Sequence, residues 1–234
     1  MNILVIDQCS KAKEYREGSP SYDADEIDDH GLEALRNRSQ TPSIAARKLY
    51  AGRQQQYIND AVDRLRASGD SVDRYFISAG FGLVEENEPL PPYDVTFADM
   101  SKSEIRDRAG KLGIQNDLLE LVSGAYDIVF FALGSDYYAS FDLPAVLGDV
   151  PGDTWAVCFN HTEVTDSFEN AVSLPARTEQ AKEQGTIVVA LKGRYLQNFA
   201  DHRGNGKEVT SAADIERYCT ETATTQTGLD QHGN

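Results

Sequence analysis

Short apolar runs alternate along this chain with longer polar and amphipathic stretches. The runs are rich in β-branched and aromatic residues, which favour buried strands. They lie at residues 2–7, 74–78, 127–133, 154–159 and 186–191. Helical or loop sequence separates each run from the next, and no tight two-residue turn joins any pair. This βαβ rhythm predicts an α/β fold with a mostly parallel five-stranded sheet and helices on both of its faces.

The first long helix is predicted from apolar residues at helical spacing after the Thr41-Pro42 pair. A threonine followed by proline is typical of an N-cap and a first helical position. The helix is expected to end near Gly69, because glycine is the common C-terminal stop signal, and to contain a break at Gly52.

A second helix start is indicated by the pair Ser101 and Glu104, which has the spacing of a capping box. This helix is expected to run to about residue 123, with a weak point at Gly113. Shorter helices are predicted nearer the C-terminal end. They lie at residues 179–183, 194–200 and 211–221.

The domain organisation follows from length and composition. A chain of 234 residues with 40% hydrophobic content can bury one sizeable core. Residues 1–221 are therefore predicted to form a single α/β domain. Residues 14–40 are polar and acidic with few apolar positions, so a surface insertion with one short helix is expected there. Residues 222–234 are polar and are expected to form a flexible tail.

The charge balance is strongly acidic, with 22 Lys and Arg against 38 Asp and Glu and a net charge of −16. The acid is spread along the whole chain and lysine is scarcer than arginine, a pattern that resembles proteins of salt-accumulating halophiles. Under this interpretation the net charge reflects the habitat, and local groups of Lys and Arg matter more for binding. The alternative interpretation is an ordinary acidic cytosolic protein. Under that interpretation the negative charge argues against a nucleic-acid partner, because phosphate binding relies on cations.

Several classes of protein are disfavoured by what the sequence lacks. Cys9, Cys158 and Cys219 are scattered without a CxxC pair, which indicates a reducing compartment and no disulfide scaffold. No apolar run is long enough to span a membrane and no basic leader precedes the first run, so a cytoplasmic protein without a membrane partner is expected. Four scattered histidines give no metal-ligand spacing. No Walker loop, GxGxxG, GxSxG or HExxH motif occurs to assign a cofactor or a mechanism.

The candidate site is predicted from the topology. Ligands of open parallel sheets bind beyond the carboxyl ends of the strands, so the residues that directly follow each predicted strand are candidates. They combine cations, hydroxyls, small residues and one carboxylate, which suits a nucleotide, a base or a phosphate. In chain order they are Cys9, Ser10, Lys11 and Lys13; Ser78, Gly80 and Gly82; Gly134, Ser135, Asp136 and Tyr137; Asn160 and His161; and Lys192, Gly193 and Arg194.

The lysines are the predicted anion-binding groups of this site. Lys11 and Lys13 lie close together in a lysine-poor chain, which favours contact with a phosphate or a carboxylate over a role as solvated surface charges. Ser10 and the backbone of residues 78–82 are expected to position the ligand. Glycines at 80 and 82 also fit a purely geometric role in the turn.

The predicted catalytic groups are two carboxylates and one thiol. Asp94 or Asp136 is the expected general base, since a carboxylate at a crowded, partly buried site acquires a raised pKa. Cys9 is a candidate nucleophile if Lys11 and Lys13 activate its thiol. The alternatives are a turn residue for Asp136 and a small packing residue for Cys9.

Three segments resemble a family of α/β proteins related to the YaaA peroxide-stress proteins. Those relatives carry a Leu/Ile-Ser-x-x-Tyr-Gly-Leu/Val turn followed by Pro-Tyr, and this chain has Phe81 where they have tyrosine. The similarity covers residues 1–138, with 193–195 as its tail, and the insertion at 14–40 departs from it. The matching segments are 9–13 (CSKAK), 46–52 (ARKLYAG) and 77–84 (ISAGFGLV), with 92–94 (PYD) behind the last.

The resemblance implies work linked to nucleic acids, because YaaA is associated with DNA binding and with protection of DNA under oxidative stress. A Cys-Ser pair followed by lysine also resembles the catalytic region of archaeosine synthase, which indicates base modification. An enzyme acting on a nucleobase, nucleoside or nucleotide is therefore the first hypothesis.

Two further hypotheses stay open. A non-catalytic DNA- or RNA-binding stress or defence protein would use aromatic side chains such as Tyr93, Tyr137 and Tyr138 to stack on bases. It would contact phosphates through a basic helix that carries Arg47, Lys48, Arg53, Arg64 and Arg66. The second of these hypotheses is a sensor that binds a small ligand and catalyses no reaction.

Overall fold

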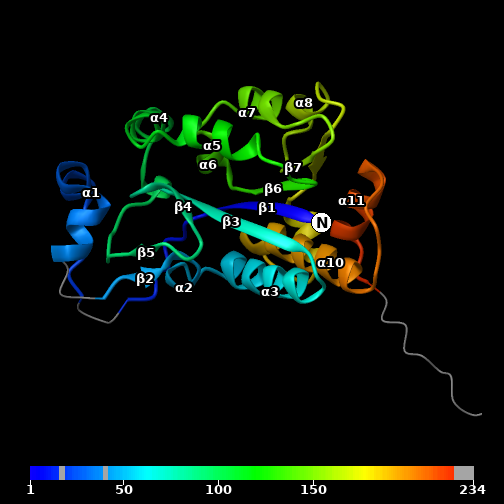
Figure 1. The fold of residues 1–234 in the computed structure, drawn as a ribbon, viewed down its shortest axis with the longest axis horizontal. Helices are drawn as coiled ribbons and strands as arrows, with labels where there is room; N and C mark the ends of the chain where they lie inside the picture. Colours follow the sequence, from blue (N-terminus) through cyan, green and yellow to red (C-terminus); the bar gives the residue numbers. More distant parts are fainter. Residues whose placement is uncertain (16–18, 39–41, 224–234) are drawn as a thin grey trace, which may run out of the picture.

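A computed structural model describes residues 1–15, 19–38 and 42–223 and has a six-stranded sheet at its centre (Figure 1). The strand order is β4-β3-β1-β6-β7-β8, and every neighbouring pair is parallel apart from β3 and β4. The α/β class and the mostly parallel sheet predicted from the sequence are confirmed. The strands are β1 (Asn2–Gln8), β3 (Ser71–Ser78), β4 (Gly82–Glu85), β6 (Ile128–Ala132), β7 (Trp155–Phe159) and β8 (Ala171–Leu174).

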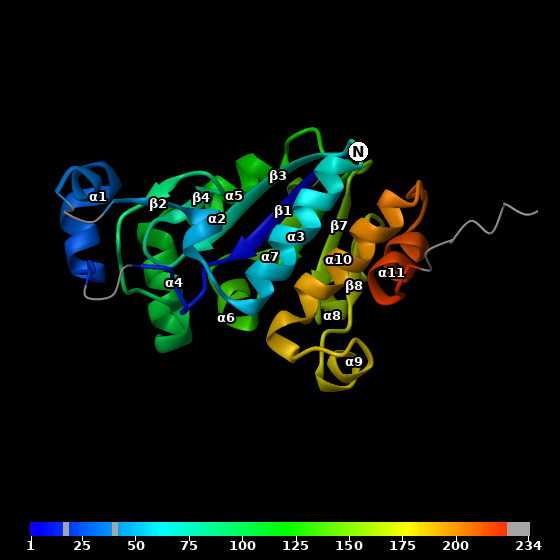
Figure 2. The ribbon, with the colours of Figure 1, turned by 90° about the horizontal axis from the view of Figure 1, so that it is seen from below.

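Helices cover both faces of the sheet, as predicted. One face carries α4 (Lys102–Lys111), α5 (Ile114–Val122), α6 (Ser135–Tyr138), α7 (Leu143–Asp149) and α8 (Thr162–Thr165) (Figure 1). The other carries α3 (Arg53–Ala67), α10 (Leu191–Gly204) and α11 (Ala212–Thr220), and Figure 2 shows α3 and α10 side by side along it. Short elements connect these layers. They are α2 (Ala46–Leu49), α9 (Thr178–Glu183), the 3₁₀ helices η1 (Phe97–Asp99) and η2 (Val188–Ala190), and the strands β2 (Ile44–Ala45) and β5 (Pro89–Leu90), which pair with each other.

The core lies in two layers, one on each face of β1. Leu4 and Ile6 pack into the cluster under α4, α5 and α7, whereas Ile3 and Val5 pack into the cluster under α3 and α10. All four side chains are 0% exposed. A central parallel strand is covered on both sides, which explains why β1 is a continuous apolar run rather than an alternating one.

The strand prediction was wrong in three places. Residues 186–191 form η2 and the start of α10 instead of a strand, and Ile187 and Val189 stay 50% and 64% exposed with no neighbouring strand to cover them. The residues that follow the predicted strand at 74–78 include a further strand, β4, which folds back antiparallel on β3 after Gly82 turns the chain at φ +75°. The edge strand β8 was missed because its run is only four residues long and Ser173 interrupts it.

The predicted helix boundaries are confirmed at several signals. Ser101 and Glu104 form the capping box at the start of α4, and Gly113 adopts a left-handed conformation at the break between α4 and α5. Gly52 precedes α3 at the predicted break. The predicted start was wrong, because Pro42 is not helical, residues 44–45 pair with β5, and the first helical turn begins at Ala46. Thr41, the expected N-cap, lies outside the described residues.

The acidic insertion contains more helix than its composition indicated. Helix α1 (Ala24–Arg38) runs through it with non-helical geometry at Gly31. Ile27 and Leu35 anchor the helix in the core at 4% and 0% exposure, and Asp28 pairs with Arg108 of α4. Residues 224–234, most of the predicted flexible tail, lie outside the described residues. No helix in the described part of the chain is long and apolar enough to cross a membrane.

Asp70 joins the turn after α3 to the end of α10, and its replacement by asparagine should destabilise the fold. Its carboxylate is 2% exposed and accepts hydrogen bonds from Arg203 at 2.7 and 3.1 Å and from the amino group of Met1 at 2.8 Å. Burial opposes the charged form, but the bonds from Arg203 and Met1 outweigh it and hold the pKa of Asp70 below its ordinary value. We expect Asp70→Asn to cost about 2 kcal/mol near neutral pH, since hydrogen bonds to charged groups contribute that much.

Urea unfolding across a range of pH checks this expectation. A carboxyl group with a lowered folded pKa contributes stability above its unfolded pKa of about 3.9, and that contribution is lost as pH falls through the folded value. The gap between wild type and Asp70→Asn should therefore be full near neutrality and should close in acid. Asp153→Asn, at an exposed position, is the matched control and should show no such gap. A gap that is constant with pH would contradict the assignment.

Candidate functional site

The carboxyl end of β1 is the topological switch point of the sheet. The connection that follows β1 leads to β3, its neighbour on one side. The connection that follows β6 leads to β7, on the other side of the sheet. The two connections therefore diverge at the carboxyl ends of β1 and β6. Sheets of this kind bind ligands in the crevice at such a point. Gln8 links the ends of these two strands, because its side-chain oxygen accepts a hydrogen bond of 2.6 Å from the Gly134 N–H.

Cys9 lies directly beyond this point and pairs with Tyr137. The Tyr137 hydroxyl donates to the Cys9 carbonyl oxygen at 2.8 Å, which uses its only proton. The Cys9 Sγ atom lies 2.9 Å from the same hydroxyl, so the thiol is the donor in that contact. Cys9 is 1% exposed and Tyr137 is 5% exposed, so the thiol lies below the protein surface at the carboxyl end of β1.

A second group of buried hydroxyls lies near this pair, toward β3. Tyr50 and Tyr93 share a hydrogen bond of 2.7 Å, and Tyr93 shares another of 2.9 Å with Ser78. Ser78 also accepts the N–H groups of Gly80 and Phe81 at 3.2 Å, which holds the turn after β3 in place. Burial raises the pKa values of Tyr50 and Tyr93 well above the ordinary value, so both remain neutral hydroxyl donors.

Lys13 is the cation of this group. Residues 12–14 pair with 49–51, and this ladder places Lys13 beside Tyr50. The Lys13 ammonium lies 4.5 Å from the centre of the Tyr93 ring. Burial lowers the pKa of Lys13, and the neighbouring Cys9 and Asp94 oppose that shift. The structure thus brings a thiol, an amine and three phenols together, and we call Cys9, Lys13, Tyr50, Ser78, Tyr93 and Tyr137 the tyrosine cluster.

Ser10, Lys11 and Asp94, which were also predicted for the site, do not belong to the tyrosine cluster. Ser10 donates to the Ala12 carbonyl oxygen and shapes the loop. Lys11 is exposed and pairs with the equally exposed Asp99 at 3.1 Å. Asp94 is exposed near Lys13.

Some of the residues predicted from the other strand ends lie near the tyrosine cluster, and others lie away from it. Ser135 and Asp136 begin α6 at the rim. Gly80 packs under Tyr93, where a Cβ atom would lie 2.7 Å from the ring. Gly82 contacts Leu112 instead, away from the crevice. Arg194 lies in α10 on the opposite face and contacts Gln197 at 3.3 Å.

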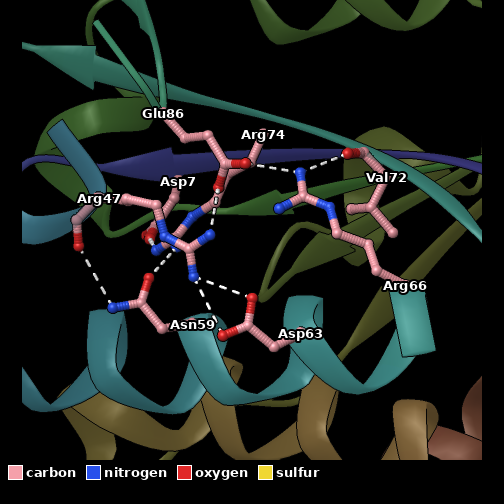
Figure 3. A network of polar contacts seen from close by, with 8 residues as sticks. All are labelled: Asp7, Arg47, Asn59, Asp63, Arg66, Val72, Arg74 and Glu86. Atoms are coloured by element: carbon pink, nitrogen blue, oxygen red, sulfur yellow. Dashed lines mark hydrogen bonds and ion pairs between the residues drawn. The ribbon is translucent and has the colours of Figure 1, made fainter. Parts of the chain in front are cut away.

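Sequence reasoning missed a second polar group on the α3 face of β1, which Figure 3 shows in part. Asp7 and Arg74 form an ion pair of 2.7 Å in which both side chains are 0% exposed. Gln54 and Gln55 donate to the same carboxylate at 2.7 and 3.3 Å. The polar Gln54-Gln55-Gln56 run at the start of α3 was the one available signal, because a helix that packs on a sheet rarely buries two glutamines without partners.

The arginines proposed for nucleic-acid contact are largely engaged within the protein. Arg47 pairs with Asp63 at 2.9 Å, and Arg66 pairs with Glu86 at 2.6 Å (Figure 3). Arg64 pairs with Asp60 and Asp201. Only Lys48 and Arg53 of that set are exposed without a contact of this kind among the described residues. This surface therefore offers few free cations for a phosphate backbone.

Two cavities lie near the tyrosine cluster, and only the first is lined by one of its residues. One of about 550 Å³ lies between α2 and α3 and includes Tyr50. Another of about 500 Å³ lies under α1 and includes Gly80 and Phe81. The part of the chain that the structure describes holds no group of three His, Cys, Asp or Glu side chains arranged to bind a metal ion.

No protein-family model matches this chain, and no curated protein matches it. The resemblance to YaaA-related proteins therefore stays a prediction from three sequence segments.

Proposed function

We propose that this protein is an enzyme that acts on a nucleobase, nucleoside or nucleotide at the carboxyl ends of β1, β3 and β6. The observation that carries the proposal is the tyrosine cluster, in which the Cys9 thiol and the Lys13 amine lie among three phenols at the switch point of the sheet. Thiols and amines of this kind serve as nucleophiles and bases, and aromatic rings suit planar ligands. The sequence similarity to the archaeosine synthase region supports base modification as the class of reaction.

Lys13 is the proposed general base and Cys9 the proposed nucleophile. Burial lowers the pKa of Lys13, which favours the neutral amine that can take the proton of the Cys9 thiol. The thiolate would then add to the electrophilic carbon of a C=N or C=C bond of the base, whose π electron pair moves onto the neighbouring ring atom. When the C–S bond breaks, that pair forms the double bond again and the sulfur leaves as a thiolate, which takes its proton back from the Lys13 ammonium. Tyr137, whose hydroxyl contacts the Cys9 sulfur, would hold the thiol in position.

A thermal-shift screen in high KCl with nucleobases, nucleosides, nucleotides and short DNA or RNA tests the proposal. A ligand at 100 times its Kd stabilises the folded state by about 2.7 kcal/mol, which is roughly 5–10 °C for a chain of this size. Each ligand that shifts the melting temperature is then incubated with the protein and the product is sought by mass spectrometry. We expect turnover with a base-containing small molecule in the wild type and its loss in Cys9→Ala and Lys13→Met.

Lys102→Met, at an exposed position in the first turn of α4, is the matched control and should keep full activity. Product formation that survives in both Cys9→Ala and Lys13→Met would overturn the assignment. A shift with polymeric nucleic acid alone, without product, would favour the non-catalytic binding protein instead. That second function has less support, because most of its predicted arginines pair with carboxylates of the protein.

A further inference from the structure

The first turns of α3 and α10 meet on the opposite face of β1 from the tyrosine cluster. Gly193 makes this contact possible, since a Cβ atom there would lie 2.7 Å from the Gln54 carbonyl oxygen and 2.9 Å from the Tyr57 Cβ atom. Gln54 in turn reaches the strand ends, because its amide nitrogen donates to Asp7 and to the Ala132 carbonyl oxygen. The helix starts thus lie at the carboxyl ends of β1 and β6.

Lys192 brings a buried positive charge to this point. Its side chain is in the first turn of α10 and only 8% of its surface is exposed. It makes no hydrogen bond and no ion pair within the described residues. The Lys192 Nζ atom, unlike Gln54 Oε1, is not fully closed off from solvent, so an anion can reach it. The pKa of Lys192 is lowered by burial, and the charge of Asp7 opposes that shift.

Asp7 does not provide that anion. One of its oxygens accepts from Arg74 at 2.7 Å, and the other accepts from Gln54 at 2.7 Å and from the Gln8 N–H at 2.8 Å. Gln55 adds a longer bond to the second oxygen. Arg74 is balanced by Asp7 and by the nearby Glu86, whereas the one carboxylate that acts on Lys192 is Asp7, whose hydrogen bonds are already directed elsewhere. The positive end of the α10 dipole lies at the same place.

Gln54 offers an acceptor without a partner at the same place. Its Nε2 atom donates to two oxygens at 2.7 Å, which fixes the orientation of the amide because only the nitrogen can donate. The Oε1 atom is consequently the free end, and it is buried with no hydrogen-bond partner. A buried acceptor of this kind is expected to have a donor in the functional state.

We propose that Lys192 and Gln54 form a binding subsite for the phosphate end of a phosphorylated ligand. The ammonium group of Lys192 and the start of α10 take the phosphate, and Gln54 Oε1 accepts a hydroxyl of the same molecule. In a nucleotide these groups are the phosphate and a hydroxyl of the sugar. The inference rests on the proposed function in that it makes the substrate a nucleotide rather than a free base, and it adds residues on the α3 face to the site.

Calorimetric titration of four nucleoside monophosphates, their nucleosides and inorganic phosphate, at matched ionic strength in KCl, tests this subsite. We expect a monophosphate to bind the wild type at least tenfold more tightly than its nucleoside. Lys192→Met should abolish that difference and should also raise the melting temperature of the ligand-free protein, because it removes an amine on a largely buried side chain that has no internal partner. Lys192→Gln is the second variant should the methionine pack poorly.

Lys182→Met, at an exposed position on α9, is the matched control and should change neither the affinity nor the ligand-free melting temperature. A lower melting temperature in both Lys192 variants would overturn the inference, because it would reveal a stabilising internal partner for the ammonium. Equal affinity of nucleotide and nucleoside for the wild type, or no binding of any phosphate-containing probe, would also overturn it.

The same titrations separate this inference from the proposed function. Nucleosides that bind and react in a Cys9-dependent way without any gain from phosphate would leave the enzyme proposal standing and remove the subsite. Inorganic phosphate that binds through Lys192 in the absence of any turnover of base-containing molecules would support the subsite and remove the proposed enzyme.

Discussion

Arg74→Met is expected to lower the free energy of unfolding by about 3–5 kcal/mol, the cost of breaking a buried ion pair at one partner. The substitution keeps the length of the side chain but leaves the Asp7 carboxylate, which is 0% exposed, without the guanidinium that forms its ion pair. Asn59 also loses its bond from Arg74, although Gln54 and Gln55 still contact Asp7. Urea unfolding followed by circular dichroism measures the change.

Two comparisons make this prediction specific to burial. Arg217→Met breaks a surface pair with Asp214, in which the arginine is half exposed, and should change stability far less than Arg74→Met. The double variant Asp7→Leu, Arg74→Met should be more stable than Arg74→Met alone, because it removes the stranded charge as well. An Arg74→Met protein as stable as the Arg217→Met protein would show that water or a neighbouring group compensates Asp7.

Gly193→Ala is expected to cost about 3 kcal/mol, although alanine normally favours a helix over glycine by ~1 kcal/mol. The new methyl group would meet the Gln54 carbonyl oxygen at 2.7 Å, which is backbone that cannot rotate away. Helices α3 and α10 would have to separate at their first turns, and the packing of both on the sheet would loosen. Thermal and urea unfolding of the variant measure the loss.

Gly110→Ala in α4 is the matched control, since nothing lies within 4 Å of a Cβ atom at that position. This substitution should raise the free energy of unfolding by about 0.5–1 kcal/mol through helix propensity and chain entropy. Opposite signs for the two glycines would confirm that contact between α3 and α10 decides the result at Gly193. A stabilising Gly193→Ala would mean that the two helix starts can move apart freely, which would also weaken the case for a preformed subsite.

The central strands and the helix signals could be predicted from the sequence because their causes are local. The run at 2–7 is apolar at nearly every position because β1 is covered on both faces, and that alone indicates a buried parallel strand. Ser101 and Glu104 satisfy each other within one turn, so the start of α4 needs no distant residue. The edge strands β4 and β8 were missed because their pairing depends on neighbours rather than on their own hydrophobicity.

The candidate site could be predicted in part, for the same kind of reason. In any sheet in which β1, β3 and β6 are parallel neighbours, the residues at their carboxyl ends lie side by side. The grouping of Cys9, Ser78 and Tyr137 therefore follows from the topology. Tyr50 was missed, because its hydroxyl reaches the cluster from α2 only through contacts made in the folded chain. Lys192 was placed after a strand that does not exist, yet it reaches the same sheet edge through the packing of α10 on α3.

The sequence by itself determined the class of fold, the central strands and the end of the strands at which several candidate residues gather, since hydrophobic period, capping pairs and strand ends are properties of short segments. Only the tertiary structure decided which charges are buried and which partners they have. Asp7, Arg74, Gln54 and Lys192 are ordinary polar residues in the sequence and come from four separate elements. Their burial depends on the packing of α3 and α10 against β1, which no short segment specifies.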